Sequence, residues 1–205
     1  MPTVRIYTKK GDDGTTGLLF GGRVSKSSSR IELNGAVDEA QATMGLVRAE
    51  AGPGSELDEL LIELERQLYV LMAEVATAPE NRHKLQAGKS LVSQEMVTGL
   101  ERHIDHLTER VTMPEEFVIP GQNRWSATLD LARTVVRRAE RLVVAAAAAG
   151  ELAGDSRVGP YLNRLSDLLW VMARWQEGDD HVRSRELPAR TSGQGTPGFG
   201  RRSAG

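Results

Sequence analysis

Glycine, hydroxyl and basic residues crowd the start of the chain. Residues 8–17 read TKKGDDGTTG, and residues 21–26 read GGRVSK. Glycines let several backbone N–H groups turn toward one anion, and neighbouring threonine and lysine side chains add further donors. Residues 1–30 hold six basic and two acidic side chains, so they carry a local charge of +4 in a chain whose formal net charge is −2. The pattern predicts a polyphosphate site; a glycine-rich surface turn with solvated charges is the simpler alternative.

A second group of charged residues lies on a single helical stripe. Asp130, Arg133, Arg137 and Glu140 are separated by three, four and three residues, which places them on one side of a helix. The rest of that segment is apolar and rich in alanine, so we expect the stripe to be enclosed. Enclosed arginines need anionic partners, either carboxylates or phosphates. A solvated stripe of salt bridges is the alternative.

Two further stretches carry polar or aromatic residues that could contact a ligand. Asn163 shares one helical face with Trp170 and Arg174. It could anchor a sugar or a phosphate, or it could form hydrogen bonds within the fold. The loop FVIPG at residues 117–121 exposes an apolar strip, which could serve a ligand or plug the end of a helical bundle.

Other kinds of site are poorly supported. The chain has no cysteine, which excludes a disulfide framework, a thiolate metal site and a cysteine nucleophile, and fits a reducing compartment. The Walker A order G-x-x-x-x-G-K-[ST] and the G-x-S-x-G elbow are both missing. Glu80 and His83 have the spacing of a di-iron motif, but a di-iron bundle needs two such motifs and two more glutamates. We expect His103 and His106 to be surface residues.

The elements that must position these residues are helices. Apolar residues recur at alternating steps of three and four in five segments. Such seams are typical of helices packed nearly antiparallel, so we predict an all-α, up-and-down five-helix bundle with no strands. Residues 1–30 form the N-terminal glycine-rich segment of the same domain, residues 31–180 the bundle, and residues 181–205 a disordered tail rich in Gly, Ser and Arg. The five predicted helices cover residues 30–51, 55–78, 93–111, 126–149 and 161–175.

Composition limits the partners and the location. The small net charge argues against binding to nucleic acid or to an anionic membrane by the chain as a whole. No apolar stretch approaches the length of about 18 residues that a membrane span requires, and residues 1–10 lack the apolar core of a secretory signal. We therefore expect a cytoplasmic protein.

Six stretches, taken together and in order, resemble the PduO-type ATP:cob(I)alamin adenosyltransferases. The resemblance covers about residues 4–175 and implies a ferritin-like homotrimer of five-helix bundles with active sites at the subunit interfaces. It also implies transfer of the 5′-deoxyadenosyl group of ATP to the cobalt of cob(I)alamin, or of an incomplete corrinoid, with release of triphosphate and with Mg²⁺ accompanying ATP. The six stretches are IYTKKGDDGTTGL, GGRVSK, RIELNGAVDEAQATMG, FVIPG, LARTVVRRAER and YLNRLSDLLWVMAR.

The resemblance assigns ATP contacts to two parts of the chain. Arg137 matches an arginine that contacts phosphate, and Glu140 and Asn163 match residues that face the ribose and adenine. The triphosphate cradle is assigned to Thr8, Lys9, Gly11, Gly14, Thr15, Thr16 and Lys26.

The resemblance also implies the corrinoid site and an interface contact. Phe117 resembles the aromatic residue under the corrin ring, which excludes the lower base and leaves cobalt four-coordinate. Asp38 and Arg133 resemble an ion pair between subunits. Asp130 stands where histidine is frequent in the family.

Partners follow from the chemistry. The task left to the protein is positioning and charge stabilisation, because the cobalt itself is the nucleophile. A flavin reductase and an enzyme that uses adenosylcobalamin are the expected partners. A trimeric cobalamin-holding or delivery protein without catalysis is the alternative function.

Overall fold

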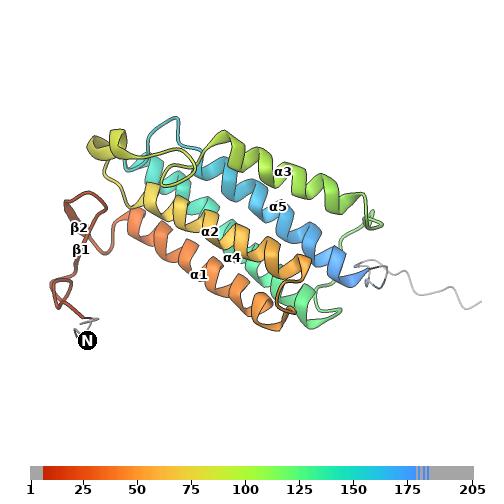
Figure 1. The fold of residues 1–205 in the computed structure, drawn as a ribbon. Helices are drawn as coiled ribbons and strands as arrows, with labels where there is room; N and C mark the ends of the chain where they lie inside the picture. Colours follow the sequence, from red (N-terminus) through yellow and green to blue (C-terminus); the bar gives the residue numbers. More distant parts are fainter. Residues whose placement is uncertain (1–6, 179, 181, 183, 185–205) are drawn as a thin grey trace, which may run out of the picture.

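Helices make up most of the chain (Figure 1). The computed structural model describes residues 7–178, 180, 182 and 184. Each predicted helical segment matches an observed α-helix to within three residues at either end, so the prediction of a mainly helical chain is confirmed. The elements are β1 (Thr15–Gly17), β2 (Arg23–Ser25), α1 (Ser29–Glu50), α2 (Glu56–Val75), the 3-10 helix η1 (Pro79–Lys84), α3 (Gln94–Thr108), α4 (Arg124–Ala148) and α5 (Val158–Glu177).

The α-helices run side by side, and successive helices alternate in direction (Figure 1). Helix α4 packs against both α1 and α5, while α2 packs on α1 and α3 on α5. The seams close on one continuous core, in which Leu64, Leu129 and Leu165 have no exposed surface. No helix within the described part of the chain has the length and apolar character needed to cross a membrane.

Side-chain caps fix where the helices start. Ser55 Oγ accepts a hydrogen bond from Asp58 N at 3.2 Å at the start of α2. Asn123 and Ser126 form a reciprocal capping box at the start of α4. Because the box fixes the first turn of α4, it also sets the position of the charged stripe that follows.

The prediction that the chain has no strands is wrong for the N-terminal segment. Strands β1 and β2 pair antiparallel, with Thr15 opposite Ser25 and Gly17 opposite Arg23. The strands are only three residues long, too short to show the alternation that identifies a strand in a sequence. The hairpin is attached to the bundle where Leu19 N donates to Ala76 O at 2.8 Å.

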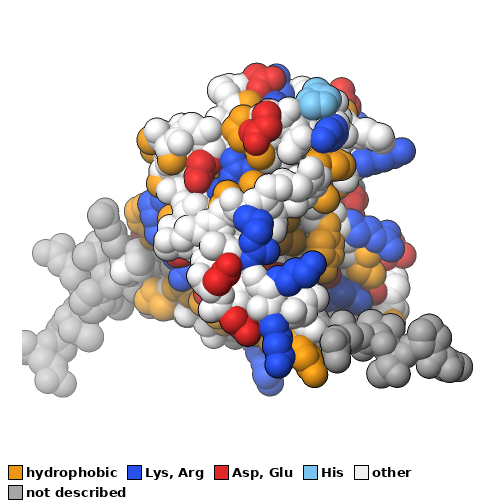
Figure 2. Space-filling view, turned by 90° about the vertical axis from the view of Figure 1, so that its left-hand side faces the viewer, with side chains coloured by type: hydrophobic (Ala, Val, Ile, Leu, Met, Phe, Trp, Pro, Cys, Tyr) orange, Lys and Arg blue, Asp and Glu red, His pale blue; other side chains and the backbone are white. Residues whose placement is uncertain are grey.

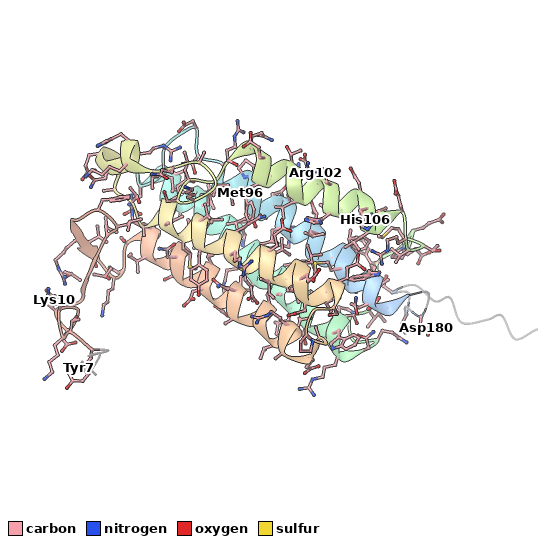
Figure 3. All side chains as sticks on the ribbon, viewed as in Figure 1. Tyr7, Lys10, Met96, Arg102, His106 and Asp180 are labelled. Carbon is pink, nitrogen blue, oxygen red and sulfur yellow. The ribbon has the colours of Figure 1, made fainter. Side chains whose placement is uncertain are left out.

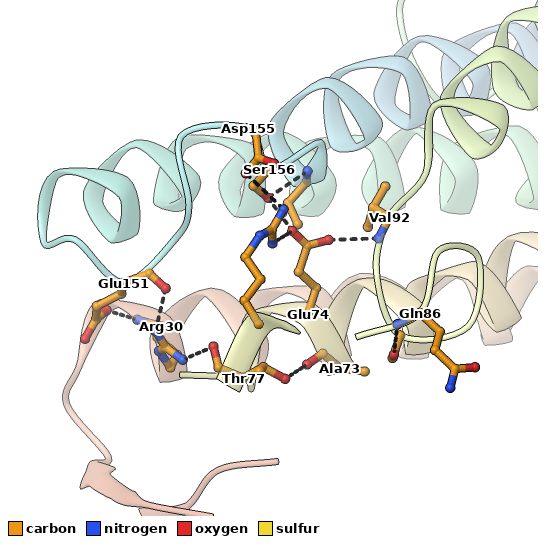
Figure 4. A network of polar contacts seen from close by, with 12 residues as sticks. Arg30, Ala73, Glu74, Thr77, Gln86, Val92, Glu151, Asp155 and Ser156 are labelled. Atoms are coloured by element: carbon orange, nitrogen blue, oxygen red, sulfur yellow. Dashed lines mark hydrogen bonds and ion pairs between the residues drawn. The ribbon is translucent and has the colours of Figure 1, made fainter. Parts of the chain in front are cut away.

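A buried polar network holds the end of the bundle next to this hairpin (Figure 4). Arg30 is 2% exposed, and its guanidinium donates to Thr77 O at 2.6 Å and to Glu151 O. The Glu151 carboxylate accepts from Arg30 N at 2.7 Å. Burial lowers the pKa of Arg30, and the nearby Glu151 partly offsets that effect. Because Thr77 follows the residue that receives Leu19, the network fixes both the start of α1 and the attachment of the hairpin.

Candidate active site

The N-terminal segment folds around its own threonine and aspartate side chains. Asp13 Oδ1 accepts hydrogen bonds from Thr15 N at 2.9 Å and Thr15 Oγ1 at 2.8 Å, and these bonds lower the pKa of Asp13. Arg23 Nε donates to Thr15 Oγ1 at 2.9 Å. Lys26 lies beside Gly11, where an added Cβ would be 3.2 Å from Lys26 Nζ. A side chain at position 11 would therefore crowd the ammonium group.

Most of the residues of this segment that were predicted to bind triphosphate lie close together in one turn. Lys26 N donates to Gly14 O at 2.9 Å, and Gly14 has a φ of 80°, a conformation that glycine adopts without strain. Thr8 and Lys9 lie farther out on the exposed loop, where Lys9 Nζ is 6.0 Å from the centre of the Tyr7 ring. The loop has the donors for an anion, but several of its polar groups are already paired with one another.

Within the single chain, one part of the charged stripe of α4 is buried and another part is exposed. The expectation that the whole stripe is enclosed is therefore wrong for the single chain. Asp130 is buried, whereas Arg137 is exposed to solvent. Among the helices of the described chain, α4 packs mainly on α1 and α5, and Arg137 lies on an exposed part of its surface. The Arg137 side chain is thus available to a ligand or a second copy of the chain.

Glu140 and Asn163 come together across the α4–α5 contact, as their proposed common role requires. Asn163 Nδ2 donates to Glu140 Oε1 at 2.9 Å, and Asn163 Oδ1 accepts from Arg164 at 2.6 Å. Asn163 therefore also forms the hydrogen bonds within the fold that were its alternative role.

A cleft of about 500 Å³ opens beside the loop that precedes α4. Phe117 stands at this cleft with 83% of its surface exposed, so the alternative that this loop plugs the bundle end is wrong for Phe117. Backbone hydrogen bonds of 2.8 Å join Ser184 N to Phe117 O and Ile119 N to Val182 O. The cleft is lined by Pro114, Glu115, Glu116, Phe117, Val118, Pro120, Asp130, Arg133, Trp170, Arg174 and Ser184.

The sequence did not predict what holds the floor of this cleft. Arg174 is 2% exposed and lies with its guanidinium 5.6 Å from the centre of the Trp170 ring. It donates to Asp130 Oδ2 at 2.7 Å. Helical spacing had placed Arg174 and Trp170 on one face, but the partner on α4 depends on how the two helices cross. Val182 and Ser184 were assigned to the tail, most of which lies outside the described residues.

The hairpin and the cleft lie at opposite ends of the bundle. Figure 3 shows Tyr7 and Lys10 beyond one end, and Asp180 beyond the other. Figure 2 faces the hairpin end, where Lys and Arg side chains stand out with Asp and Glu between them. Helix α4 has 25 residues and so measures about 37 Å, and it lines the cleft near its start, at Asp130 and Arg133.

Asp38 and Arg133 are not paired within the chain. Asp38 is exposed on α1 beside a hollow of about 590 Å³ between α1 and α2. Arg133 instead donates through Nε to Asp130 Oδ1 at 3.2 Å. An ion pair between Asp38 and Arg133 therefore needs a second copy of the chain.

Histidine and acidic side chains do not gather into a metal site in the described part of the chain. No group of three or more His, Cys, Asp or Glu side chains there could hold an ion. Glu80 and His83 lie in the 3-10 helix η1, and His83 Nδ1 is 2.9 Å from Glu80 O. His106 is exposed and His103 is partly so.

Comparison with known proteins identifies the family. The model for the cobalamin adenosyltransferase family matches residues 6–176. The chain belongs to this family. A corrinoid adenosyltransferase of Citrobacter freundii is 39% identical over 173 residues, which cover 84% of this chain and 95% of the relative. The corrinoid adenosyltransferase PduO of Salmonella typhimurium is 37% identical over 180 residues, 86% of this chain, and the match spans 51% of that relative.

Solved structures of this family share the fold. A phenylalanine-to-alanine variant of the PduO-type ATP:corrinoid adenosyltransferase from Lactobacillus reuteri, complexed with cobalamin and ATP, has a TM-score of 0.77 and 27% identity. The match covers 89% of this chain and all of that one. An arginine-to-lysine variant complexed with ATP has a TM-score of 0.75 and 27% identity, with coverage of 88% and 100%.

Proposed function

We propose that this chain transfers the 5′-deoxyadenosyl group of ATP to the cobalt of cob(I)alamin. The cobalt(I) electron pair attacks the 5′ carbon, the bond from that carbon to the triphosphate oxygen breaks, and triphosphate leaves with the bonding pair. Cobalt is formally oxidised to cobalt(III) in adenosylcobalamin. The observation that carries the proposal is the family match over residues 6–176.

The cleft at Phe117 suits a corrinoid. A corrin is broad and flat, and its faces need apolar contact, which the exposed Phe117 ring offers at the mouth of the cleft with Trp170 behind it. Phe117 would lie against the lower face of the ring and exclude the base and water. Four-coordinate cobalt would then accept the electron that produces cob(I)alamin.

ATP would be bound between two copies of the chain in a homotrimer. The N-terminal segment supplies donors at one end of the bundle, while Arg137, Glu140 and Asn163 lie along α4 and α5. Because the segment and the cleft lie at opposite ends of the bundle in one chain, the segment of one copy would complete the α4–α5 face of the next. Asp38 and Arg133 would pair across the same contact.

Each ATP-binding residue has a group suited to its proposed role. Arg137 is exposed and would form charge-assisted hydrogen bonds with phosphate. Glu140 and Asn163 would face the ribose and adenine. Mg²⁺ would be carried by the phosphates, where it would help neutralise the leaving triphosphate.

The reaction also implies partners. Cob(I)alamin must be supplied by a reductase, for which a flavin enzyme is suited, and the product is consumed by enzymes that require adenosylcobalamin. A location in the cytoplasm, where thiols and corrinoids are kept reduced, fits both.

A turnover assay tests the proposal. Purified protein is mixed with ATP, Mg²⁺ and chemically reduced cobalamin, and the absorbance spectrum of adenosylcobalamin is followed while released triphosphate is quantified. We expect one triphosphate for each adenosylcobalamin formed. Binding of both substrates without product would instead support the holding or delivery function.

A further inference from the structure

Four charged side chains meet beneath the Phe117 cleft. Asp130 and Arg133 come from α4, and Arg174 and Glu177 come from α5; we call these four residues the charge cluster. Asp130, Arg174 and Glu177 are 4%, 2% and 7% exposed, so three charges lie almost completely out of water. Such burial is tolerated only where the charges are paired with each other.

The charges of the three buried side chains do not cancel one another. Arg174 pairs with Asp130 Oδ2 at 2.7 Å and, through Nε, with Glu177 Oε2 at 2.8 Å. Two carboxylates therefore face one guanidinium, which leaves a net charge of −1. Arg133 supplies the missing positive charge by donating from Nε to Asp130 Oδ1 at 3.2 Å.

The two carboxylate oxygens of Asp130 thus contact different arginines, one in the core and one at the cleft. Oδ2 binds the buried Arg174, and Oδ1 binds Arg133, whose side chain is 27% exposed and lines the cleft. The bond to Asp130 uses Nε, which leaves the two terminal nitrogens of the Arg133 guanidinium out of that contact. Arg174 in turn is fixed by Glu177 and by the Trp170 ring.

We propose that Asp130 is a positioning residue that, braced by Arg174, sets the place and orientation of Arg133 at the wall of the cleft. The proposal rests on the proposed function, because Arg133 matters to turnover only if the cleft and the facing copy form the site. It extends that function to a buried aspartate and a buried arginine at the floor of the cleft.

A double-mutant cycle separates positioning from simple stability. In the first variant, Asp130→Asn, turnover at saturating ATP should fall about tenfold while the ATP KM changes by less than about twofold. In the Arg133→Ala background, adding Asp130→Asn should lower turnover no further, because Asp130 acts through Arg133. Thermal unfolding should show the reverse pattern, with Asp130 strongly coupled to Arg174 and weakly to Arg133.

Asp58→Asn is the matched control. Asp58 is another buried carboxylate paired with an arginine, Arg48 at 3.1 Å, but it lies at the start of α2 and does not line the cleft. This variant should lose stability and keep the turnover of each folded molecule. If Asp130→Asn does not fold, the triple variant Asp130→Asn, Arg174→Gln, Glu177→Gln removes all three buried charges, leaves no carboxylate unpaired, and should fold with the same loss of turnover.

The outcomes are distinct. Equal losses of turnover from Asp130→Asn in the wild-type and Arg133→Ala backgrounds would overturn the positioning role, as would wild-type turnover in a folded Asp130 variant. An inactive wild-type chain would instead mean that the proposed function has failed. The same cycle would then be measured as affinity for cob(II)alamin, and an absence of binding would remove both proposals.

Discussion

Replacing Phe117 by Ala should leave the fold intact and weaken the corrinoid site. Phe117 is 83% exposed, so truncation removes little buried surface and should change the free energy of unfolding by less than about 0.5 kcal/mol. A phenylalanine side chain buries roughly 150–250 Å² when it is fully covered. If a corrin covers one face of the ring, about 80–100 Å² leaves water, which corresponds to about 2 kcal/mol.

That free energy predicts a loss of about thirtyfold in affinity for cob(II)alamin. The assay is a titration of the variant, already saturated with ATP, with cob(II)alamin, in which the absorbance and paramagnetic resonance spectra report four-coordinate cobalt. The four-coordinate fraction should fall because water or the lower base can enter the space left by the ring. Affinity for ATP should be unchanged.

Ile119→Ala is the matched control for this experiment. Ile119 is 52% exposed in the same loop but does not line the cleft, and its backbone bond to Val182 O survives the substitution. It should bind cob(II)alamin like the wild type. If the Phe117 variant also shows wild-type affinity and a wild-type four-coordinate yield, Phe117 does not lie against the corrin ring.

Three further perturbations test the ATP site, the contact between subunits and the buried Tyr161. Arg137→Ala should raise the ATP KM or lower turnover by about 10- to 150-fold, since one charge-assisted hydrogen bond contributes about 1.5–3 kcal/mol. Arg137→Lys should restore only part of the loss. Unchanged ATP kinetics in the alanine variant would remove Arg137 from the site. Asp38→Asn and Arg133→Ala should each weaken the trimer by about 3–5 kcal/mol in sedimentation equilibrium and be strongly non-additive, whereas small additive effects would indicate that the two residues do not pair. Burial, with a smaller effect from Glu63, raises the pKa of Tyr161, whose hydroxyl donates to Gln67 at 3.0 Å. The pKa of Tyr161 in the folded protein lies above the unfolded value of about 10, so the stability that neutral Tyr161 contributes is complete below about pH 10 and is lost as the pH rises beyond it. Tyrosinate absorbance should show one tyrosine that ionises only when the protein unfolds. Ionisation of that tyrosine in the folded protein would contradict the prediction.

The helices were predictable because their signals are local. Seams such as that from Leu57 to Val75 repeat at helical spacing, and Ser55 caps the helix it precedes. The hairpin was not predictable, since strands of three residues leave no period and its attachment through Leu19 depends on a residue far along the chain. Local pattern thus indicated which elements form but not how the N-terminal segment docks.

The candidate site was predictable in its residues and less so in its contacts. The spacing on α4 correctly placed Asp130 and Arg133 side by side, and the two residues are hydrogen-bonded. It wrongly suggested that Arg137 is enclosed, because spacing shows which residues share a face but not which helix covers that face. The burial of Arg174 was not predicted for the same reason, since its partner Asp130 depends on the crossing of α4 and α5.

The proposed function places adenosyl transfer at a site shared by two copies of the chain. The most direct measurement mixes two variants, Lys26→Ala and Arg137→Ala, each of which should be nearly inactive alone. After the mixture is dissociated and reassembled, about a quarter of the interfaces join an intact N-terminal segment to an intact α4 face, so about a quarter of the wild-type rate of adenosylcobalamin formation should return. A mixture no more active than the two variants separately would contradict the shared site.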